Sequence, residues 1–261
     1  MIPLRDENPT RRFPFVTVAI IAACAGIYFF VQPVGQASLT PQNPRGQLLE
    51  DYRFNLENAA IPCEIVTGRP LTVEEIERTV RGDATACADD PGSQPLFPAK
   101  NVFLAIAYSM FLHGSLLHLG GNMLFLWVFG NNIEDTRRVV QYILFYVAAG
   151  VVATATHIAL QPSSTVPLVG ASGAIAGVMG AYLVLFPRVP IRTLIIFFFI
   201  MFRDIEARWL LGLWFLSQFF VNPNAGVAWA AHVGGFVFGV LVGIAWRPRR
   251  PRNPQPAWFG A

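Results

Sequence analysis

The stretch LVGASGAIAGVMGAY (168–182) places one serine, Ser172, among mainly glycine, alanine and aliphatic residues. Pro167 disfavours helical geometry just before it and Gly170 loosens the backbone, so we expect a helix to begin near Ser172. From there to Pro187, about 15 residues of helix rise only about 22 Å, less than the roughly 30 Å of hydrocarbon in a bilayer. In a membrane the first turn would therefore lie below the surface, where non-helical backbone must be buried in protein or line a wet cavity.

The composition of the whole chain is that of a membrane protein. Hydrophobic residues make up 54% of the 261 residues and charged residues only 13%, and the mean hydropathy is +0.46. These values exceed what a soluble globular domain usually carries. The net charge of +3 comes from arginine, since Lys100 is the sole lysine, and nothing in it indicates a nucleic-acid partner.

Six apolar runs are predicted to cross the membrane as helices. They are residues 13–31, 116–129, 139–160, 171–186, 207–221 and 227–246. The first run follows three arginines, as a secretory signal peptide would, but it is longer than the roughly 7–15 apolar residues of such a signal, so we expect it to be retained. The segment 193–220 holds two apolar runs split by charged residues, and its length alone allows one crossing or two.

The distribution of arginine selects one crossing for 193–220 and orients the protein. With six spans both termini lie on one side together with the arginine-rich connections, and such a side marks the cytoplasm. A seventh crossing would export the arginine-rich tail, so we expect residues 194–202 to lie at the membrane interface.

We therefore predict a multi-pass protein of the cell (inner) membrane with cytoplasmic termini. Its predicted parts are a cytoplasmic N-terminus (1–12), a first transmembrane helix (13–31), an extracytoplasmic loop (32–110), a core of five transmembrane helices (111–246) and a disordered basic cytoplasmic tail (247–261). The tail is expected to contact anionic lipid weakly.

The extracytoplasmic loop carries signals of local structure. LTVEEIERTV (71–80) predicts a short amphipathic helix that begins at a threonine cap. Cys63 and Cys87 lie in this loop, and they can pair in an oxidising compartment, but two free thiols fit the sequence nearly as well. Cys24, in the first span, is expected to be a small apolar packing residue.

All four histidines lie in or beside the predicted spans, where polar groups are costly and mark functional sites by default. The second, fourth and sixth spans run inward, so their first turns lie at similar depth in the outer half of the membrane. This shared depth gathers His118 and Asn122, four residues apart on one helix face, with Ser172 and His232. A single histidine considered alone is more often a hydrogen-bonded packing residue, and we expect this role for His157.

The gathered groups suit acyl transfer, which needs a hydroxyl nucleophile, a base and N–H donors for the oxyanion. We predict a Ser172–His232 dyad, because no carboxylate lies inside the spans to complete a triad. Asn122, His118 and the backbone N–H groups of Ser172 and Gly173 at the helix start are the predicted oxyanion donors.

Two pairs of glycines would let the fourth and sixth spans approach closely. Gly173 and Gly177 in one span, and Gly235 and Gly239 in the other, are each spaced by four residues. Ordinary helix packing explains such glycines at least as well as a catalytic role. Close packing of these two faces is nevertheless what a dyad between the two spans requires.

The chain resembles the rhomboid family of intramembrane serine proteases, of the bacterial six-span type. The similar stretches are FLHGSLLHLGGNMLFLWVFGNNIED (111–135), GASGAIAGVMGAY (170–182) and AWAAHVGGFVFG (228–239). GxSG alone is a weak pattern, but its combination with the H-x-x-x-N of the second span and the glycine-spaced motif after His232 is specific.

The resemblance implies an all-α membrane protein, a rhomboid-like bundle of six transmembrane helices with a long extracytoplasmic loop after the first. The short fourth helix would be surrounded by the others, with Ser172 as nucleophile and His232 as base. It also implies a water-retaining or structural role for His113. The implied substrates are single-span membrane proteins, cut within or near the span after entering past a mobile fifth helix.

The resemblance further implies that Glu134 and Arg137 tie the second and third helices together. Two features depart from the family pattern: the first loop is much longer than in a minimal member, and Ala176 stands where some members place an aromatic residue against the imidazole. The support of His232 therefore stays open.

Three other functions fit the sequence less well. A catalytically inactive relative usually lacks the serine or the histidine, and a transporter or channel would predict internal repeats and a polar path through both leaflets. A soluble α/β-hydrolase elbow would need glycine at Ala174 and a strand before the serine. No cofactor or metal is expected, since neither metal-ligand spacing nor a nucleotide loop is present.

Overall fold

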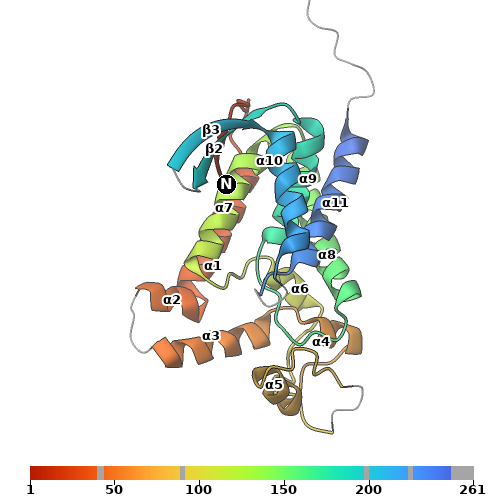
Figure 1. Ribbon diagram of the computed structural model, residues 1–261. Coiled ribbons are helices and arrows are strands. Elements are labelled where there is room, and N and C mark those ends of the chain that lie inside the picture. The colour runs from red at the N-terminus through yellow and green to blue at the C-terminus, as the bar shows by residue number, and fades with distance from the viewer. Residues whose placement is uncertain (40–43, 89–91, 197–199, 223–225, 248–261) are drawn as a thin grey trace, which may run out of the picture.

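The computed structural model describes residues 1–39, 44–88, 92–196, 200–222 and 226–247. Its body is a bundle of upright helices (Figure 1). They are α1 (Phe15–Phe30), α7 (Leu116–Asp135), α8 (Val139–Leu160), α9 (Ser172–Leu185), α10 (Ala207–Ser217) and α11 (Trp229–Trp246). Each overlaps one of the six predicted apolar runs, although α7 extends past the predicted end at residue 129 and α10 ends before residue 221. By length and composition, α8 and α11 can cross a membrane, and α1 and α9 are shorter apolar helices.

Helix α9 lies at the centre of the bundle, packed against α7, α8, α10 and α11. It begins at Ser172 and has 14 residues, so the prediction of a short helix that starts there is confirmed. Every residue from Gly173 to Tyr182 is buried, because small side chains let the neighbouring helices close around it.

The glycine faces of α9 and α11 touch through their backbones. A Cβ atom added to Gly235 would lie 2.1 Å from the carbonyl oxygen of Gly173, and one added to Gly239 would lie 1.9 Å from that of Gly177. Both distances are far below van der Waals contact, so the predicted close approach of these two helices is confirmed.

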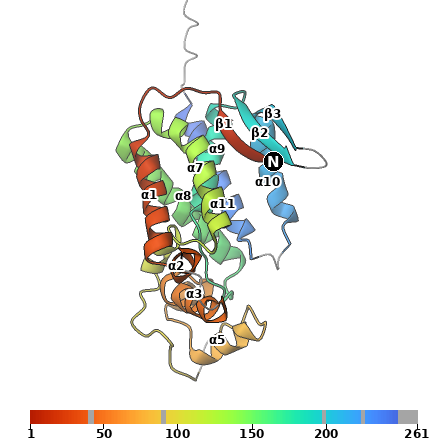
Figure 2. The ribbon, with the colours of Figure 1, turned by 90° about the vertical axis from the view of Figure 1, so that its left-hand side faces the viewer.

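A three-stranded antiparallel sheet lies at the end of the bundle where α7 ends and α9 ends (Figures 1 and 2). It consists of β1 (Ile2–Asp6), β2 (Pro190–Ile196) and β3 (Ile200–Glu206) in that order. Arg192 on β2 faces Asp204 on β3, and their side chains form an ion pair of 3.1 Å.

The prediction of an all-α protein is therefore corrected to a mostly helical one. Residues 194–202, expected to lie at the interface, belong in their described part to the β2–β3 hairpin, and the N-terminal segment supplies β1. Alternation is visible in the first half of β2, where Ile191 and Thr193 are buried and Pro190 and Arg192 are exposed. The tail predicted over 247–261 lies, after Arg247, outside the described residues.

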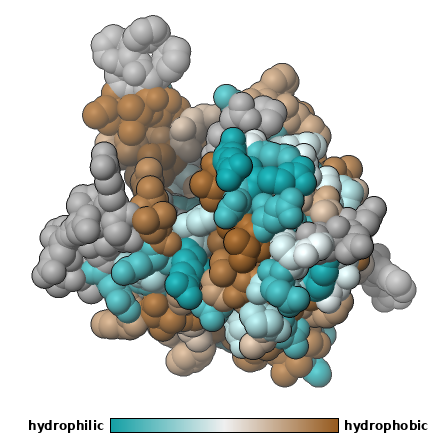
Figure 3. Space-filling view, turned by 90° about the horizontal axis from the view of Figure 1, so that it is seen from below, coloured by the Kyte–Doolittle hydropathy of each residue, from teal (hydrophilic) through white to brown (hydrophobic). Residues whose placement is uncertain are grey.

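Short helices occupy the opposite end of the bundle. They are α2 (Pro33–Leu39), α3 (Pro44–Asn58), α4 (Pro62–Thr67), α5 (Val73–Val80) and α6 (Leu104–Ser109). We call residues 44–100 the loop subdomain. Seen from this end, hydrophilic residues cover much of the surface between hydrophobic ones (Figure 3).

The loop subdomain is held together by three kinds of bond. A disulfide joins Cys63 and Cys87, which decides the alternative that the sequence left open. Thr72 caps α5 in a capping box with Glu75, so the predicted helix with its threonine cap is confirmed. Burial would raise the pKa of Glu75, but the ion pair with Arg69 and the hydrogen bonds from backbone N–H groups hold that pKa at about 2.

Two charged residues of α7 and its C-terminal turn have other partners than the family resemblance implies. Glu134 accepts hydrogen bonds from the backbone N–H groups of Val16 and Thr17 over 2.9 and 2.8 Å, and so caps α1. Arg137 donates to the carbonyl oxygen of Trp246 over 2.8 Å and lies over its ring, which ties it to α11. The implied tie between the second and third helices is therefore wrong: helix-end N–H and C=O groups that lack intrahelical partners attract these charges.

Candidate active site

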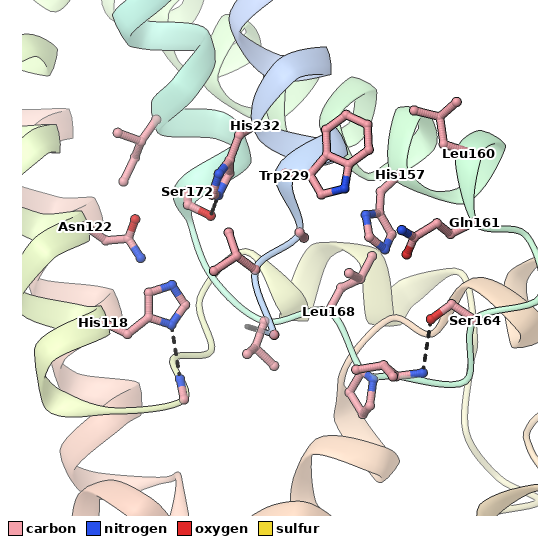
Figure 4. Close-up of a pocket in the computed structure, with 18 of the residues that line it drawn as sticks. His118, Asn122, His157, Leu160, Gln161, Ser164, Leu168, Ser172, Trp229 and His232 are labelled. Carbon is pink, nitrogen blue, oxygen red and sulfur yellow. Dashed lines mark hydrogen bonds between the residues drawn. The ribbon is translucent and has the colours of Figure 1, made fainter. Parts of the chain in front are cut away.

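Ser172 and His232 form a hydrogen-bonded pair between α9 and α11. Ser172 is the first residue of α9, and His232 lies in the first turn of α11. The distance from Ser172 Oγ to His232 Nε2 is 2.8 Å (Figure 4). The contact follows from the glycine faces, because it is their close packing that brings the two helix starts together.

The pair lies on the wall of a cavity of about 1160 Å³. Helices α7, α8, α9, α10 and α11 contribute to its lining, as do the connections 161–169 and 226–228. Ala84 and Thr85 of the loop subdomain also line it. The cavity therefore reaches from the bundle to the end that carries the loop subdomain.

His118 and Asn122 face this cavity from α7, one helical turn apart (Figure 4). Asn122 is 8% exposed, and among the described residues no protein group bonds its buried Nδ2 atom. The Nδ1 atom of His118 faces the backbone N–H of Gly114 over 3.5 Å, which leaves Nε2 toward the cavity. A buried amide without a partner is costly, so Asn122 is suited to donate to a bound group.

Gly170 and the start of α9 complete this wall. The φ angle of Gly170 is +129°, and a Cβ atom there would lie 2.9 Å from Cε1 of His118. Only glycine therefore fits. No side chain caps α9, so the N–H groups of Ser172 and Gly173 point out of the helix start without intrahelical acceptors.

His113 lies behind the site rather than in it. Its ring is fully buried, 5.3 Å from the ring of His118 between centroids. Gln32 holds its backbone: His113 N–H donates to Gln32 Oε1 over 2.9 Å, and Gln32 Nε2 donates to the His113 carbonyl over 3.1 Å. His113 thus packs against His118 and does not line the cavity.

His157, expected to be a packing residue, has a side chain that lines the same cavity (Figure 4). It is 5% exposed, and within the described part of the chain its Nδ1 atom has no hydrogen-bond partner. The hydrogen-bonded packing role expected for His157 is therefore not what the described residues show. The cavity lining includes the end of α8 and the starts of α7, α9 and α11, so α8 runs opposite to those three helices and its end meets the same cavity.

Two residues near His232 were missed by the sequence analysis. Gln218, at the end of α10, places Oε1 2.8 Å from His232 Nδ1, and the ring of Trp214 lies 5.8 Å from the imidazole between centroids. A signal was available for Gln218, because it is an amide within the apolar run WFLSQFF (214–220), and polar groups in such runs mark functional sites.

The described residues offer one group of side chains at metal-ligand distance, away from this cavity. Cys63, Glu75 and Cys87 approach one another within 4.8 Å. Both sulfur atoms belong to the disulfide, however, and a disulfide supplies no thiolate ligand.

Known proteins resemble the part of the chain that carries this site. The chain is 33% identical over 173 residues to Rhomboid protein 1, mitochondrial, of Saccharomyces cerevisiae, which is 60% of this chain and 47% of that protein. It is 30% identical over 169 residues to Presenilin-associated rhomboid-like protein, mitochondrial, of Bos taurus, or 59% of this chain and 42% of that protein. The chain thus spans about half the length of the curated relatives it matches. Residues 100–249, more than half of the chain, match the Rhomboid domain family, and the chain therefore belongs to the rhomboid family.

Proposed function

We propose that this protein is an intramembrane serine endopeptidase that cleaves single-span membrane proteins within or near their transmembrane segment. The observation that carries the proposal is the 2.8 Å contact between Ser172 Oγ and His232 Nε2 on the wall of a large cavity. Membership of the rhomboid family supports the same reaction class.

In the proposed reaction Ser172 Oγ attacks the scissile carbonyl carbon while His232 Nε2 takes the hydroxyl proton. The C–N bond then breaks, and His232 gives this proton to the leaving amine. Water from the cavity attacks the resulting ester, again with His232 as base, and releases the second product. Imidazole alone suffices as general base where its neighbours hold its orientation.

The negative charge on the carbonyl oxygen is proposed to be stabilised by four donors. These are the Asn122 amide, the His118 ring and the backbone N–H groups of Ser172 and Gly173. Asn122 Nδ2 has no partner within the described part of the chain, which supports this role, because a donor without a ground-state partner breaks no hydrogen bond when charge develops.

The proposed topology has α1, α7, α8, α9, α10 and α11 as six membrane spans of the cell membrane. Both termini and the sheet would lie in the cytoplasm, and the loop of residues 32–110 outside it, with the cavity open to that side. Arginines at the sheet end support this orientation. The disulfide between Cys63 and Cys87 supports it independently, since disulfides persist in oxidising compartments.

The test is fluorophosphonate labelling and cleavage of a single-span substrate by the protein reconstituted in liposomes. We expect label on Ser172 of the wild type, and neither label nor cleavage with Ser172→Ala. In His232→Ala, the rates of labelling and of cleavage should both fall by several orders of magnitude, because the general base is then absent.

Ser163→Ala is the matched control, because Ser163 lines the same cavity and is not among the described hydrogen-bond partners of the pair, and it should label and cleave as the wild type does. Unfolding temperatures establish that all variants are folded. Cleavage by folded Ser172→Ala would contradict the proposal.

A further inference from the structure

Gln218 holds the imidazole of His232 on the side opposite to Ser172. Its Oε1 atom lies 2.8 Å from His232 Nδ1, while His232 Nε2 lies 2.8 Å from Ser172 Oγ. Gln218 is 6% exposed and stands at the C-terminal end of α10, whereas His232 belongs to α11. One buried amide thus reaches the histidine from another helix.

The hydrogen bonds of the Gln218 amide nitrogen determine the orientation of the side-chain amide. Nε2 donates to the carbonyl oxygen of Trp214 over 3.0 Å and to Ser217 Oγ over 3.2 Å. The Ser217 hydroxyl donates its own hydrogen bond to the same Trp214 carbonyl oxygen, over 2.6 Å. A carbonyl oxygen only accepts hydrogen bonds, so turning the amide over would set two oxygens against each other.

The end of α10 makes the Trp214 carbonyl available for this role. The backbone N–H of Gln218 bonds to the carbonyl groups of Leu216 and Phe215 instead of that of Trp214. Carbonyls in the last turn of a helix need other donors, and the side chains of Ser217 and Gln218 supply them. The helix end and the amide orientation therefore stabilise each other.

This orientation determines which ring nitrogen of His232 carries the proton. Oε1 of Gln218 has no hydrogen, so the hydrogen bond requires a proton on Nδ1, and in the neutral ring Nε2 then carries the lone pair. The Ser172 hydroxyl donates its hydrogen bond to this lone pair. We propose that Gln218 is a positioning residue that selects the Nδ1–H tautomer of His232 and aims Nε2 at Ser172. The inference rests on the proposed function of this pair.

The second support of the imidazole also comes from α10. The ring of Trp214 lies 5.8 Å from that of His232, with 39° between the planes, and it stands in for the aromatic residue that Ala176 does not provide. Trp214 belongs to α10, and Gln218 directly follows it. A displacement of α10 would therefore remove both supports of the imidazole, so the position of α10 and the orientation of the His232 ring are coupled.

The test compares Gln218→Leu with Gln36→Leu. Gln36 is an exposed glutamine whose Nε2 likewise donates to a carbonyl near a helix end, that of Phe30 over 3.1 Å, away from the cavity. For Gln218→Leu we expect kcat and the rate of fluorophosphonate labelling to fall roughly 10- to 100-fold, since misplacing a reacting group by about 1 Å costs about this much. KM should stay within about twofold, and Gln36→Leu should match the wild type. Gln218→Met, of the same length, serves if the leucine variant does not fold.

A spectroscopic measurement reads the tautomer directly. In ¹⁵N-histidine-labelled protein, the His232 resonances, assigned by their absence in His232→Ala, should show the proton on Nδ1 in the wild type and a tautomer mixture in Gln218→Leu. A proton on Nε2 in the wild type, or unchanged kcat in folded Gln218→Leu, overturns the inference. If the wild type neither cleaves nor labels, the proposed function fails, and the spectrum still decides the role of Gln218.

Discussion

At the residue scale, the candidate site holds a buried polar group without a hydrogen-bond partner among the described residues. This group is the Nδ2 atom of Asn122, whose carboxamide is almost fully buried. Leaving a buried donor unpaired costs roughly 1–3 kcal/mol of stability. Such a cost is consistent with a donor kept for the transition state rather than for the fold.

The Asn122→Ala variant should therefore lose activity without losing stability. We expect kcat to fall by about 10²–10³, the effect typical of one oxyanion donor, and the unfolding temperature to stay the same or rise. Steady-state cleavage in liposomes and thermal unfolding in detergent measure the two effects. Asn58→Ala, which removes a bond of 2.9 Å to the Phe54 carbonyl in the loop subdomain, should leave kcat unchanged. An Asn122→Ala protein that is less stable but equally active would assign the residue to packing.

At the scale of elements, the contact between α9 and α11 sets the geometry of the pair. Their backbones touch at Gly235 and Gly239, and α9 also lies against Ala149 and Ala153 of α8. Because interiors are close-packed, a methyl group at this contact has no space unless the helices separate. The distance between Ser172 and His232 therefore follows the spacing of the two helices.

Gly235→Ala should separate α9 from α11 and misplace the histidine. We expect a destabilisation of about 1–3 kcal/mol, as for other overpacked sites, together with a large loss of cleavage and labelling. Gly26→Ala is the control, since a Cβ atom at Gly26 of α1 meets nothing within 4 Å. Thermal unfolding and cleavage assays compare the two proteins. Wild-type activity in Gly235→Ala would show that the helices tolerate separation.

At the scale of the whole molecule, the two ends of the bundle differ in structure. The loop subdomain carries a disulfide and a buried ion pair between Lys100 and Glu64, whereas the other end carries the sheet. Removing one partner of such a buried ion pair costs about 3–5 kcal/mol of stability. Because the disulfide and this pair tie its segments together, the subdomain is a folded unit rather than a free linker.

The proposed orientation predicts which end is reached from outside the cell. Val80, 68% exposed on the loop subdomain, and Ile200, 72% exposed on the sheet, form a matched pair. In intact cells stripped of any outer envelope, a membrane-impermeant maleimide should label Val80→Cys at once and Ile200→Cys only after permeabilisation. The reverse pattern would invert the topology, and equal labelling of both would place the two ends on one side.

The sequence by itself determined the helices and the central pair. The ranges of α8, α9 and α11 follow from apolar run length and from Pro167, and the pairing of Ser172 with His232 follows from depth and glycine spacing. These features are local, or depend only on the direction in which each helix runs, so one chain without a structure suffices to predict them.

Tertiary structure alone decided the contacts between distant segments. Strand β1 pairs with β2 across some 190 residues, Glu134 caps α1, and Gln218 meets His232 from another helix. Each depends on the rotation and offset of whole helices and on where helix-end N–H and C=O groups remain unpaired. The pattern of residues along the chain contains neither quantity, and only the packed fold determines them.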